Sequence, residues 1–196
     1  MISRPLSRRS GKRMSVLAAA VLLVLISCHG GMNMIMKDTK PPLTAKKDRA
    51  LLVIIRTTSF QAGYVVGNYL DGKMIGQTQF KSYFLTEVRP GKHYVVSQAD
   101  NKDAVRINFE GGRIYFLQQG MYPGWNATSR YSVMTLDDFK IQVQESTYSV
   151  YDTQHPGKDM DAKDYKDATD DFDKLSKEDP PRYKEFTGYR GYTAAK

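Results

Sequence analysis

Short runs of apolar or alternating apolar and polar residues fill the middle of this 196-residue chain, from Ala50 to about Thr135. They are rich in β-branched and aromatic residues, which is typical of strands. Turn signals separate them, and Asp71-Gly72 is the strongest because both residues tolerate the positive φ angles of a tight hairpin. The segments expected to form strands are residues 50–57, 63–70, 73–80, 82–88, 93–99, 104–110, 113–119 and 131–135.

This succession predicts a mainly β fold, an antiparallel β-sandwich of about seven to eight strands, over residues 49–150. Residues 137–147 fit two structures. Ile141-Gln142-Val143 favours a strand, and Asp137-Asp138 before Phe139 favours the start of a short helix. The many aromatic residues of the domain favour core and cross-strand packing over an exposed platform for carbohydrate.

The amino-terminal residues have the three zones of a secretory signal peptide. A basic region precedes eleven apolar residues, Val16–Ile26, which are too few to span a bilayer. The only cysteine of the chain follows in Leu25-Ile26-Ser27-Cys28, which resembles the bacterial lipobox. The resemblance implies that residues 1–27 are removed and that lipid on Cys28 holds the mature protein on a membrane.

Two features follow the cysteine. His29 stands where, in enterobacterial sorting, an aspartate would retain a lipoprotein on the inner membrane, so it favours an outer-membrane lipoprotein that faces the periplasm. Residues 28–48 mix Gly, Pro, Lys and Met without a clear period, which predicts a lipidated, flexible tether.

The central domain resembles a known type of module. Leu70–Thr78 and Val88–His93 resemble PEGA-like sandwich domains. With Tyr83-Phe84, Gly111-Gly112 and Tyr115–Gly120, the chain more closely resembles a family of small bacterial lipoproteins of unknown function. The resemblance covers about residues 48–146 and implies an exported β-sandwich with no known activity.

The charge of the chain argues against a nucleic-acid partner. The formal net charge is +8, but five of the 29 basic residues and no acidic residue lie in residues 1–27. The remainder has 24 basic and 21 acidic residues, a net charge of +3. Binding to nucleic acid needs a basic face that persists in the fold.

Candidate catalytic groups are scattered. The three histidines, His29, His93 and His155, are far apart in the sequence and form no cluster of metal-ligand spacing. The chain has no nucleophile motif centred on serine and no glycine-rich phosphate loop. We therefore expect no metal, no cofactor and no enzymatic activity.

Two segments are candidates for interaction. The loop Gly120–Tyr131 contains Tyr122 and the only tryptophan, Trp125, and loops on rigid scaffolds often carry binding residues. The alternative is a corner between strands with Trp125 in the core.

The second segment is the carboxy-terminal tail, residues 151–196. Tyr165, Ala168, Phe172 and Leu175 form one apolar stripe that predicts a charged helix, either docked on the sandwich or partly disordered until a partner binds. Four aromatic residues then recur every three positions among basic residues, which favours a polyproline-type strip over a short helix. The strip is either a ligand for an envelope protein or cell-wall polymer, or a disordered or self-docking terminus. Its residues are Tyr183, Phe186, Tyr189 and Tyr192.

Together these observations favour a membrane-anchored lipoprotein of the bacterial cell envelope that acts as a non-catalytic binding or structural accessory module. The alternative functions are an envelope hydrolase, which needs convergent catalytic groups, and a carrier of a small ligand, which needs a pocket in the sandwich.

Overall fold

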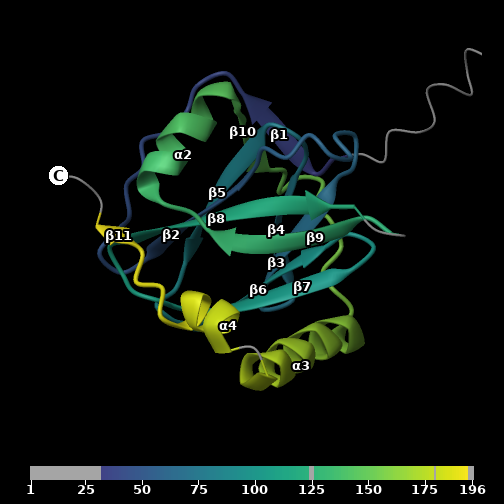
Figure 1. The fold of residues 1–196 in the computed structure, drawn as a ribbon. Coiled ribbons are helices and arrows are strands. Elements are labelled where there is room, and N and C mark those ends of the chain that lie inside the picture. The colour runs from purple at the N-terminus through teal and green to yellow at the C-terminus, as the bar shows by residue number, and fades with distance from the viewer. Residues whose placement is uncertain (1–31, 124–125, 179, 194–196) are drawn as a thin grey trace, which may run out of the picture. The chain divides into compact units, whose positions relative to one another are not determined.

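Two β-sheets form the fold, in a computed structural model that describes residues 32–123, 126–178 and 180–193 (Figure 1). The described residues from Asn33 onward belong to one unit, residues 33–196. The predicted signal peptide and Cys28 lie outside the described residues.

The larger sheet has the strand order β1-β10-β5-β2-β8-β11, and β9 also pairs with β8. The smaller sheet has the order β4-β3-β6-β7. Most neighbours are antiparallel, and the pairs β2–β8 and β10–β5 are parallel. The strands are β1 (Met34–Lys37), β2 (Ala50–Arg56), β3 (Val66–Leu70), β4 (Lys73–Thr78), β5 (Ser82–Val88), β6 (Gly91–Gln98), β7 (Lys102–Phe109), β8 (Arg113–Tyr122), β9 (Thr128–Val133), β10 (Thr147–Tyr151) and β11 (Tyr192–Thr193).

The predicted mainly β sandwich is confirmed, and each of the eight expected strands has a counterpart among β2 to β9. The continuous apolar run of β2 is explained by its central place in the larger sheet, where every residue of the strand is buried. Leu51, Val53 and Ile55 share one face of β2 and pack with Phe139. At the β3–β4 turn, Asp71 and Gly72 both have positive φ, as the hairpin signal predicts.

The ambiguous segment is helical at its start. Helix α2 (Leu136–Gln142) is followed by the single turn η1 (Val143–Glu145). Thr135 caps α2 by accepting a hydrogen bond from the backbone N–H of Asp138 at 3.0 Å, and the helix buries Phe139 against the larger sheet. The helix therefore covers an apolar face that the strands alone would leave in water.

The predicted tether contains an ordered strand. β1 lies inside residues 28–48 and pairs with β10, from Met34 opposite Tyr151 to Lys37 opposite Tyr148. Met34 is buried, and the backbone N–H of Asn33 donates to the side chain of Gln77 at 2.6 Å. These four residues, which have no clear hydrophobic period, form a strand because they pair with the edge of β10. The sequence of the segment itself does not show that this edge is available.

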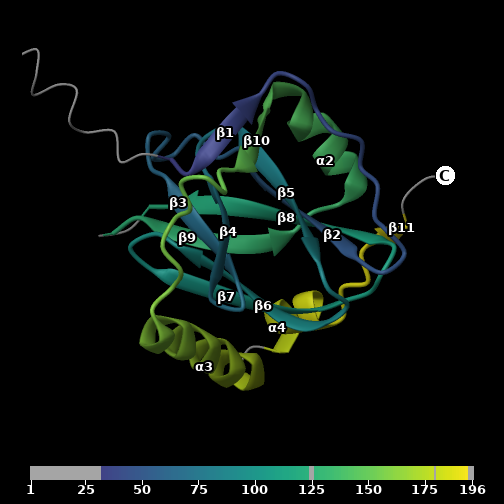
Figure 2. The same ribbon diagram turned by 180° about the vertical axis from the view of Figure 1, so that it is seen from behind.

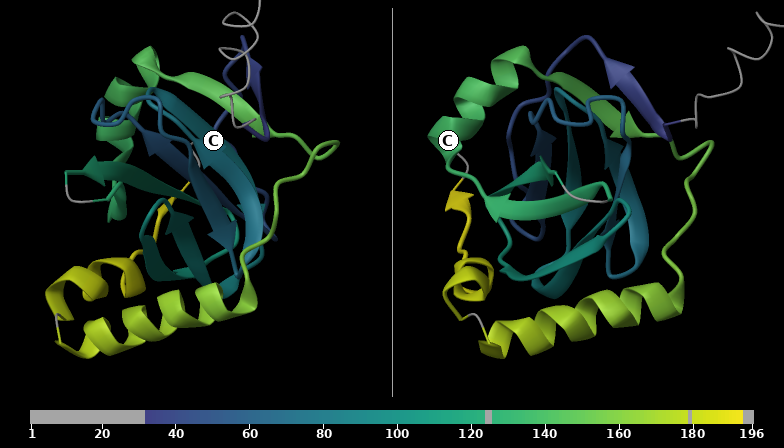
Figure 3. Two further views of the ribbon diagram at one scale, coloured as in Figure 1. Left: turned by 90° about the vertical axis from the view of Figure 1, so that its right-hand side faces the viewer. Right: turned by 45° about the vertical axis from the view of Figure 1, so that its right-hand side comes forward.

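The carboxy-terminal residues pack on the sandwich. The chain leaves β10, runs down beside β4 (Figure 2) and enters α3 (Ala162–Glu178), α4 (Pro180–Thr187) and β11. Along β4, Asp159 pairs with Lys73 at 2.8 Å and accepts from the backbone N–H of Met74 at 3.0 Å. Figure 3 shows α3 and α4 at the opposite end of this unit from β1 and α2.

A buried polar cluster joins the two sheets. Its members, which we call the Asn68 cluster, are all buried and come from β3, β4, β8 and β9: Asn68, Thr78, Gln119 and Tyr131. The Asn68 side-chain oxygen accepts from the Tyr131 hydroxyl at 2.5 Å and from the Gln119 amide at 3.1 Å. The Asn68 amide donates to the Val66 carbonyl at 3.1 Å, and the Thr78 hydroxyl donates to Gln119. The members thus satisfy one another inside the sandwich.

Replacing Asn68 with leucine is expected to lower the free energy of unfolding by about 2–6 kcal/mol, because it leaves the two buried donors of Gln119 and Tyr131 without their acceptor at about 1–3 kcal/mol each. Equilibrium urea unfolding measures the change. The matched control is Asn108→Leu on the exposed face of β7, where we expect a change within about 0.5 kcal/mol. Equal effects of the two substitutions would contradict a structural role for the Asn68 cluster.

Candidate interaction surface

Side chains of residues 100–103 close the outer edge of β9. These residues span the turn after β6 and the first two residues of β7, and we call them the turn 100–103. Three of their side chains bond the backbone of alternate residues just before and within β9, where a further strand would otherwise pair. Asp100 accepts from Ala127 N–H at 2.7 Å, Asn101 accepts from Ser129 N–H at 2.7 Å and donates to its carbonyl at 2.9 Å, and Asp103 accepts from Tyr131 N–H at 2.8 Å.

Asp100 also connects this turn to the loop that follows β2. The Tyr64 hydroxyl donates to Asp100 at 2.7 Å, and this bond, followed by the bond from Ala127 N–H, lowers the pKa of Asp100 below its usual value of 3.8. Burial, and then the neighbouring carboxylate, raises the pKa of Tyr64 to about 12. One carboxylate thereby holds the base of the β8–β9 connection in place.

A buried arginine shapes the loop that presents Tyr64. The Arg56 guanidinium, at the end of β2, donates to the carbonyls of Tyr64 at 2.5 Å, Gln61 at 2.7 Å and Phe60 at 3.3 Å. Burial lowers the pKa of Arg56. The Arg56 side chain thus supplies the hydrogen bonds that these three carbonyl groups would otherwise take from water, and it fixes the position of Tyr64.

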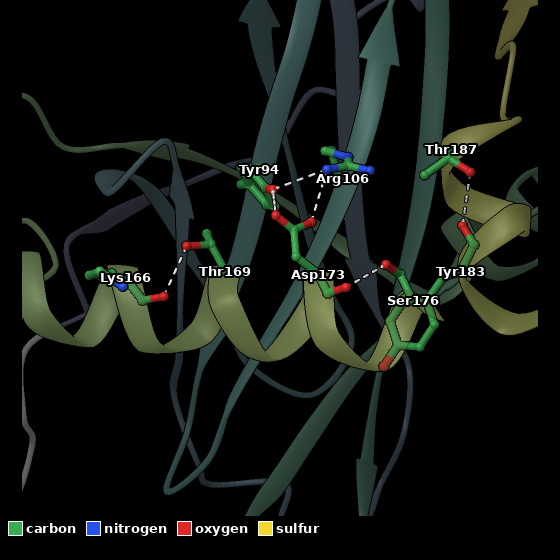
Figure 4. A network of polar contacts seen from close by, with 8 residues as sticks. All are labelled: Tyr94, Arg106, Lys166, Thr169, Asp173, Ser176, Tyr183 and Thr187. Atoms are coloured by element: carbon green, nitrogen blue, oxygen red, sulfur yellow. Dashed lines mark hydrogen bonds and ion pairs between the residues drawn. The ribbon is translucent and has the colours of Figure 1, made fainter. Parts of the chain in front are cut away.

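Charged contacts fasten helix α3 to the smaller sheet, and Figure 4 shows the one made by Asp173. Asp173 of α3 pairs with Arg106 of β7 at 2.9 Å and accepts from the Tyr94 hydroxyl of β6 at 2.9 Å. Burial, and then the hydrogen bond to Asp173, raises the pKa of Tyr94. The Arg106 guanidinium also lies 5.6 Å from the ring centre of Phe172, a buried residue of α3. The predicted apolar stripe of this helix is therefore docked on the sandwich.

The four aromatic residues of the predicted carboxy-terminal strip also pack on the sandwich. Tyr183 and Phe186 are buried, and Tyr183 meets Phe172 edge-on with ring centres 4.7 Å apart. The expectation of a polyproline-type strip is wrong for these two residues, because Pro180 and Pro181 begin helix α4. Proline fits the first turn of a helix, and positions three apart share a helix face.

The last two aromatic residues complete an edge of β8. The Tyr189 hydroxyl accepts from the backbone N–H of Phe116 at 3.0 Å, and burial raises the pKa of Tyr189. Tyr192 lies in β11 and pairs with Ile114. The carboxy-terminal aromatic residues therefore contribute to the core.

A small pocket of about 170 Å³ lies where α3 and α4 meet the starts of β7 and β9. Phe172, Leu175 and Tyr183 supply its apolar wall, and Lys102, Asp103 and Arg130 supply charged groups. Lys102 pairs with Asp164 of α3 at 3.0 Å. Because pockets for whole small ligands are about 300–1,000 Å³, this one has room for a single side chain or a group of similar size.

Arg130 links the pocket to Tyr122. Its guanidinium lies 6.0 Å from the ring centre of Tyr122, which is 48% exposed. Of the candidate residues predicted from the sequence, Tyr122 is therefore exposed beside Arg130, and Tyr183 is buried in the wall of the pocket that Arg130 also lines. Trp125 lies outside the described residues. The sequence carried no signal for Arg130 or Lys102, because single basic residues in strands are common on solvent-facing positions.

Comparison of the chain with protein-family models, curated proteins and solved structures found no match. The resemblance to a PEGA-like lipoprotein family therefore stays a prediction. Across the described ranges, no three His, Cys, Asp or Glu side chains gather in a way that could hold a metal ion. None of the described helices has the length and hydropathy needed to cross a membrane.

Replacing Asp173 with alanine is expected to weaken the docking of α3 by about 1 kcal/mol, because a half-exposed ion pair contributes about 0–1 kcal/mol and a hydrogen bond is lost with it. Hydrogen exchange should show roughly fivefold lower protection of α3 amides. The control is Asp171→Ala, at an exposed position of the same helix, and a similar loss there would contradict the role of Asp173.

Acid is expected to loosen the base of the β8–β9 connection. Folding lowers the pKa of Asp100, so its contribution to stability is complete above the usual value of 3.8 and is lost as the pH falls through the lower folded value. The protection factor of the Ala127 amide, followed by hydrogen exchange down to about pH 2.5, measures this loss. The variant Asp100→Asn has no carboxyl group to titrate at this position, so the protection of the Ala127 amide should lose this dependence on pH. The same pH dependence in the variant and the wild type would contradict the role of Asp100.

Proposed function

We propose that this protein is a lipoprotein held on a membrane of the bacterial envelope through lipid on Cys28, and that its folded part is a non-catalytic binding or structural module facing the periplasm. The observation that carries the proposal is the position of the only cysteine. It closes a lipobox-like sequence and precedes the first strand of the sandwich, β1, by six positions. The PEGA-like family resemblance is in line with such an exported module.

The buried polar groups that the structure describes inside the sandwich favour a module that binds on its outer surface. Four polar side chains from both sheets, the Asn68 cluster, are buried and bonded to one another. Ser97 and Ser129, also buried, are 2.7 Å apart. A hydrolase or carrier would instead direct such groups toward a bound ligand. We therefore favour binding on the outer surface, at the Tyr122–Arg130 pair and the adjoining pocket.

The chemistry of that surface suits a protein or polymer partner. The guanidinium of Arg130 is exposed beside an exposed aromatic ring, and Leu175 at the pocket is 43% exposed. Arginine and tyrosine are enriched at interaction hot spots, and here they adjoin a small pocket that has both charged and apolar lining residues. A partner with an acidic group and one apolar side chain would match these features.

The first test is fractionation of cells. Cys28→Ala should move the protein from the membrane fraction to the soluble envelope fraction, because the only thiol that can carry lipid is lost. The control is Ser27→Ala, which keeps a small residue before the cysteine and should leave the protein on the membrane. Retention of Cys28→Ala on the membrane would contradict anchoring through Cys28.

The same cells test the module by crosslinking and mass spectrometry. A partner captured by the wild-type protein should be lost in Leu175→Asp and kept in Phe60→Asp, since the two side chains are 43% and 41% exposed and only Leu175 lines the pocket. Substitution is preferable to truncation because the carboxy-terminal aromatic residues are part of the core. Equal capture by both variants would exclude the pocket, and capture of no partner by the wild type would count against a binding role.

A further inference from the structure

Only a short segment separates the proposed anchor from the fold. Met34, the first residue of β1, is the sixth residue after Cys28. Six residues span at most about 22 Å when extended, and about 13 Å on average as a flexible chain. A unit of the size of residues 33–196 has a radius of gyration of roughly 15 Å. Lipid on Cys28 would therefore hold the β1 end nearest to the bilayer.

That end of the unit carries exposed apolar side chains. Ile35 and Met36 on β1 are 43% and 55% exposed, and Ile141 on α2 is 72% exposed. β1 is the last strand of its sheet on this side, so one of its edges has no neighbouring strand among the described residues. The two elements lie together: Lys40, just after β1, donates to the carbonyls of Val143 and Gln144, which follow α2.

The position of these residues differs from that of the pocket. Figures 1 to 3 place β1 and α2 at one end of the unit and α3 and α4 at the other. Exposed apolar side chains gain free energy when they leave water for a less polar surrounding. At the end tied to a lipid anchor, the bilayer interface is the surface within reach, and apolar side chains gain free energy by entering it.

We propose that β1 and α2 form a membrane-contact surface in which Ile35, Met36 and Ile141 enter the interfacial region of the bilayer. The inference rests on the proposed lipid on Cys28. Exposed Lys37 lies in the same strand, where its ammonium group can meet lipid phosphate. The consequence is a fixed orientation: the pocket beside α3 is directed away from the membrane toward partners in the periplasm.

The test uses the mature lipoprotein reconstituted in vesicles of phosphatidylethanolamine and phosphatidylglycerol. Because lipid occupies the Cys28 sulfur, a cysteine introduced by Met36→Cys is the only free thiol and takes an environment-sensitive fluorophore. The control is Leu175→Cys at the opposite end, a position of similar exposure. Lipids with a quencher near the headgroup should quench the label at position 36 several-fold more strongly than the label at position 175.

The alternative outcomes are distinct. Equal or absent quenching at both positions, with lipid on Cys28 established by mass spectrometry, would overturn the membrane-contact surface and leave the proposed anchor intact. Absence of lipid on Cys28 would overturn the proposed function and this inference with it. Disulfide-linked dimers through position 36 that form without vesicles would assign the β1 edge to a second copy of the chain and overturn the inference.

Discussion

The contact between the two sheets depends on the hydrogen bonds of Asn68. Its side-chain oxygen accepts hydrogen bonds from Tyr131 and Gln119 of the larger sheet, and its amide group lies beside the Thr78 hydroxyl of the smaller sheet. Apolar contacts would permit several offsets between the sheets, because hydrophobic attraction has little directionality. Four buried polar groups satisfy one another in only one arrangement, and any displacement leaves some of them unpaired at considerable cost. The position of β9, and with it the turn 100–103 that closes its edge, follows from this arrangement.

The carboxy-terminal residues show how a charged segment can belong to a core. The stripe of α3 contributes Phe172, and α4 contributes Tyr183 and Phe186, to a layer under the smaller sheet. The ion pair of Asp173 with Arg106 is half exposed, so it contributes little to the free energy of folding and mainly fixes the position of α3 on the sheet. The same packing creates the small pocket, since the helices meet the sheet beside Arg130. The carboxy-terminal helices therefore form part of the surface of this protein, although their sequence also suited a segment that binds other proteins.

The proposed anchor and the proposed interaction surface are related through the fold. β1 shortens the chain between Cys28 and the sandwich to a few residues, which would limit the orientations of a unit anchored through Cys28. The apolar residues at that end and the arginine and tyrosine at the pocket would then face different surroundings. A lipoprotein with a long tether could reach many partners without a preferred orientation, whereas the proposed short anchor would favour partners that approach from one side.

The sequence by itself determined the mainly β architecture, the strands β2 to β9 and the helix that carries the apolar stripe, α3, because each rests on local periodicity and turn chemistry. It also supplied the lipobox-like cysteine. The tertiary structure decided the rest. β1 forms because β10 offers an edge, Tyr183 and Phe186 are buried because α4 faces α3, and Arg130 reaches Tyr122 and the pocket because the turn 100–103 holds β9. These features depend on residues far apart in the chain, and a local pattern contains no information about which distant surface will be available to pair.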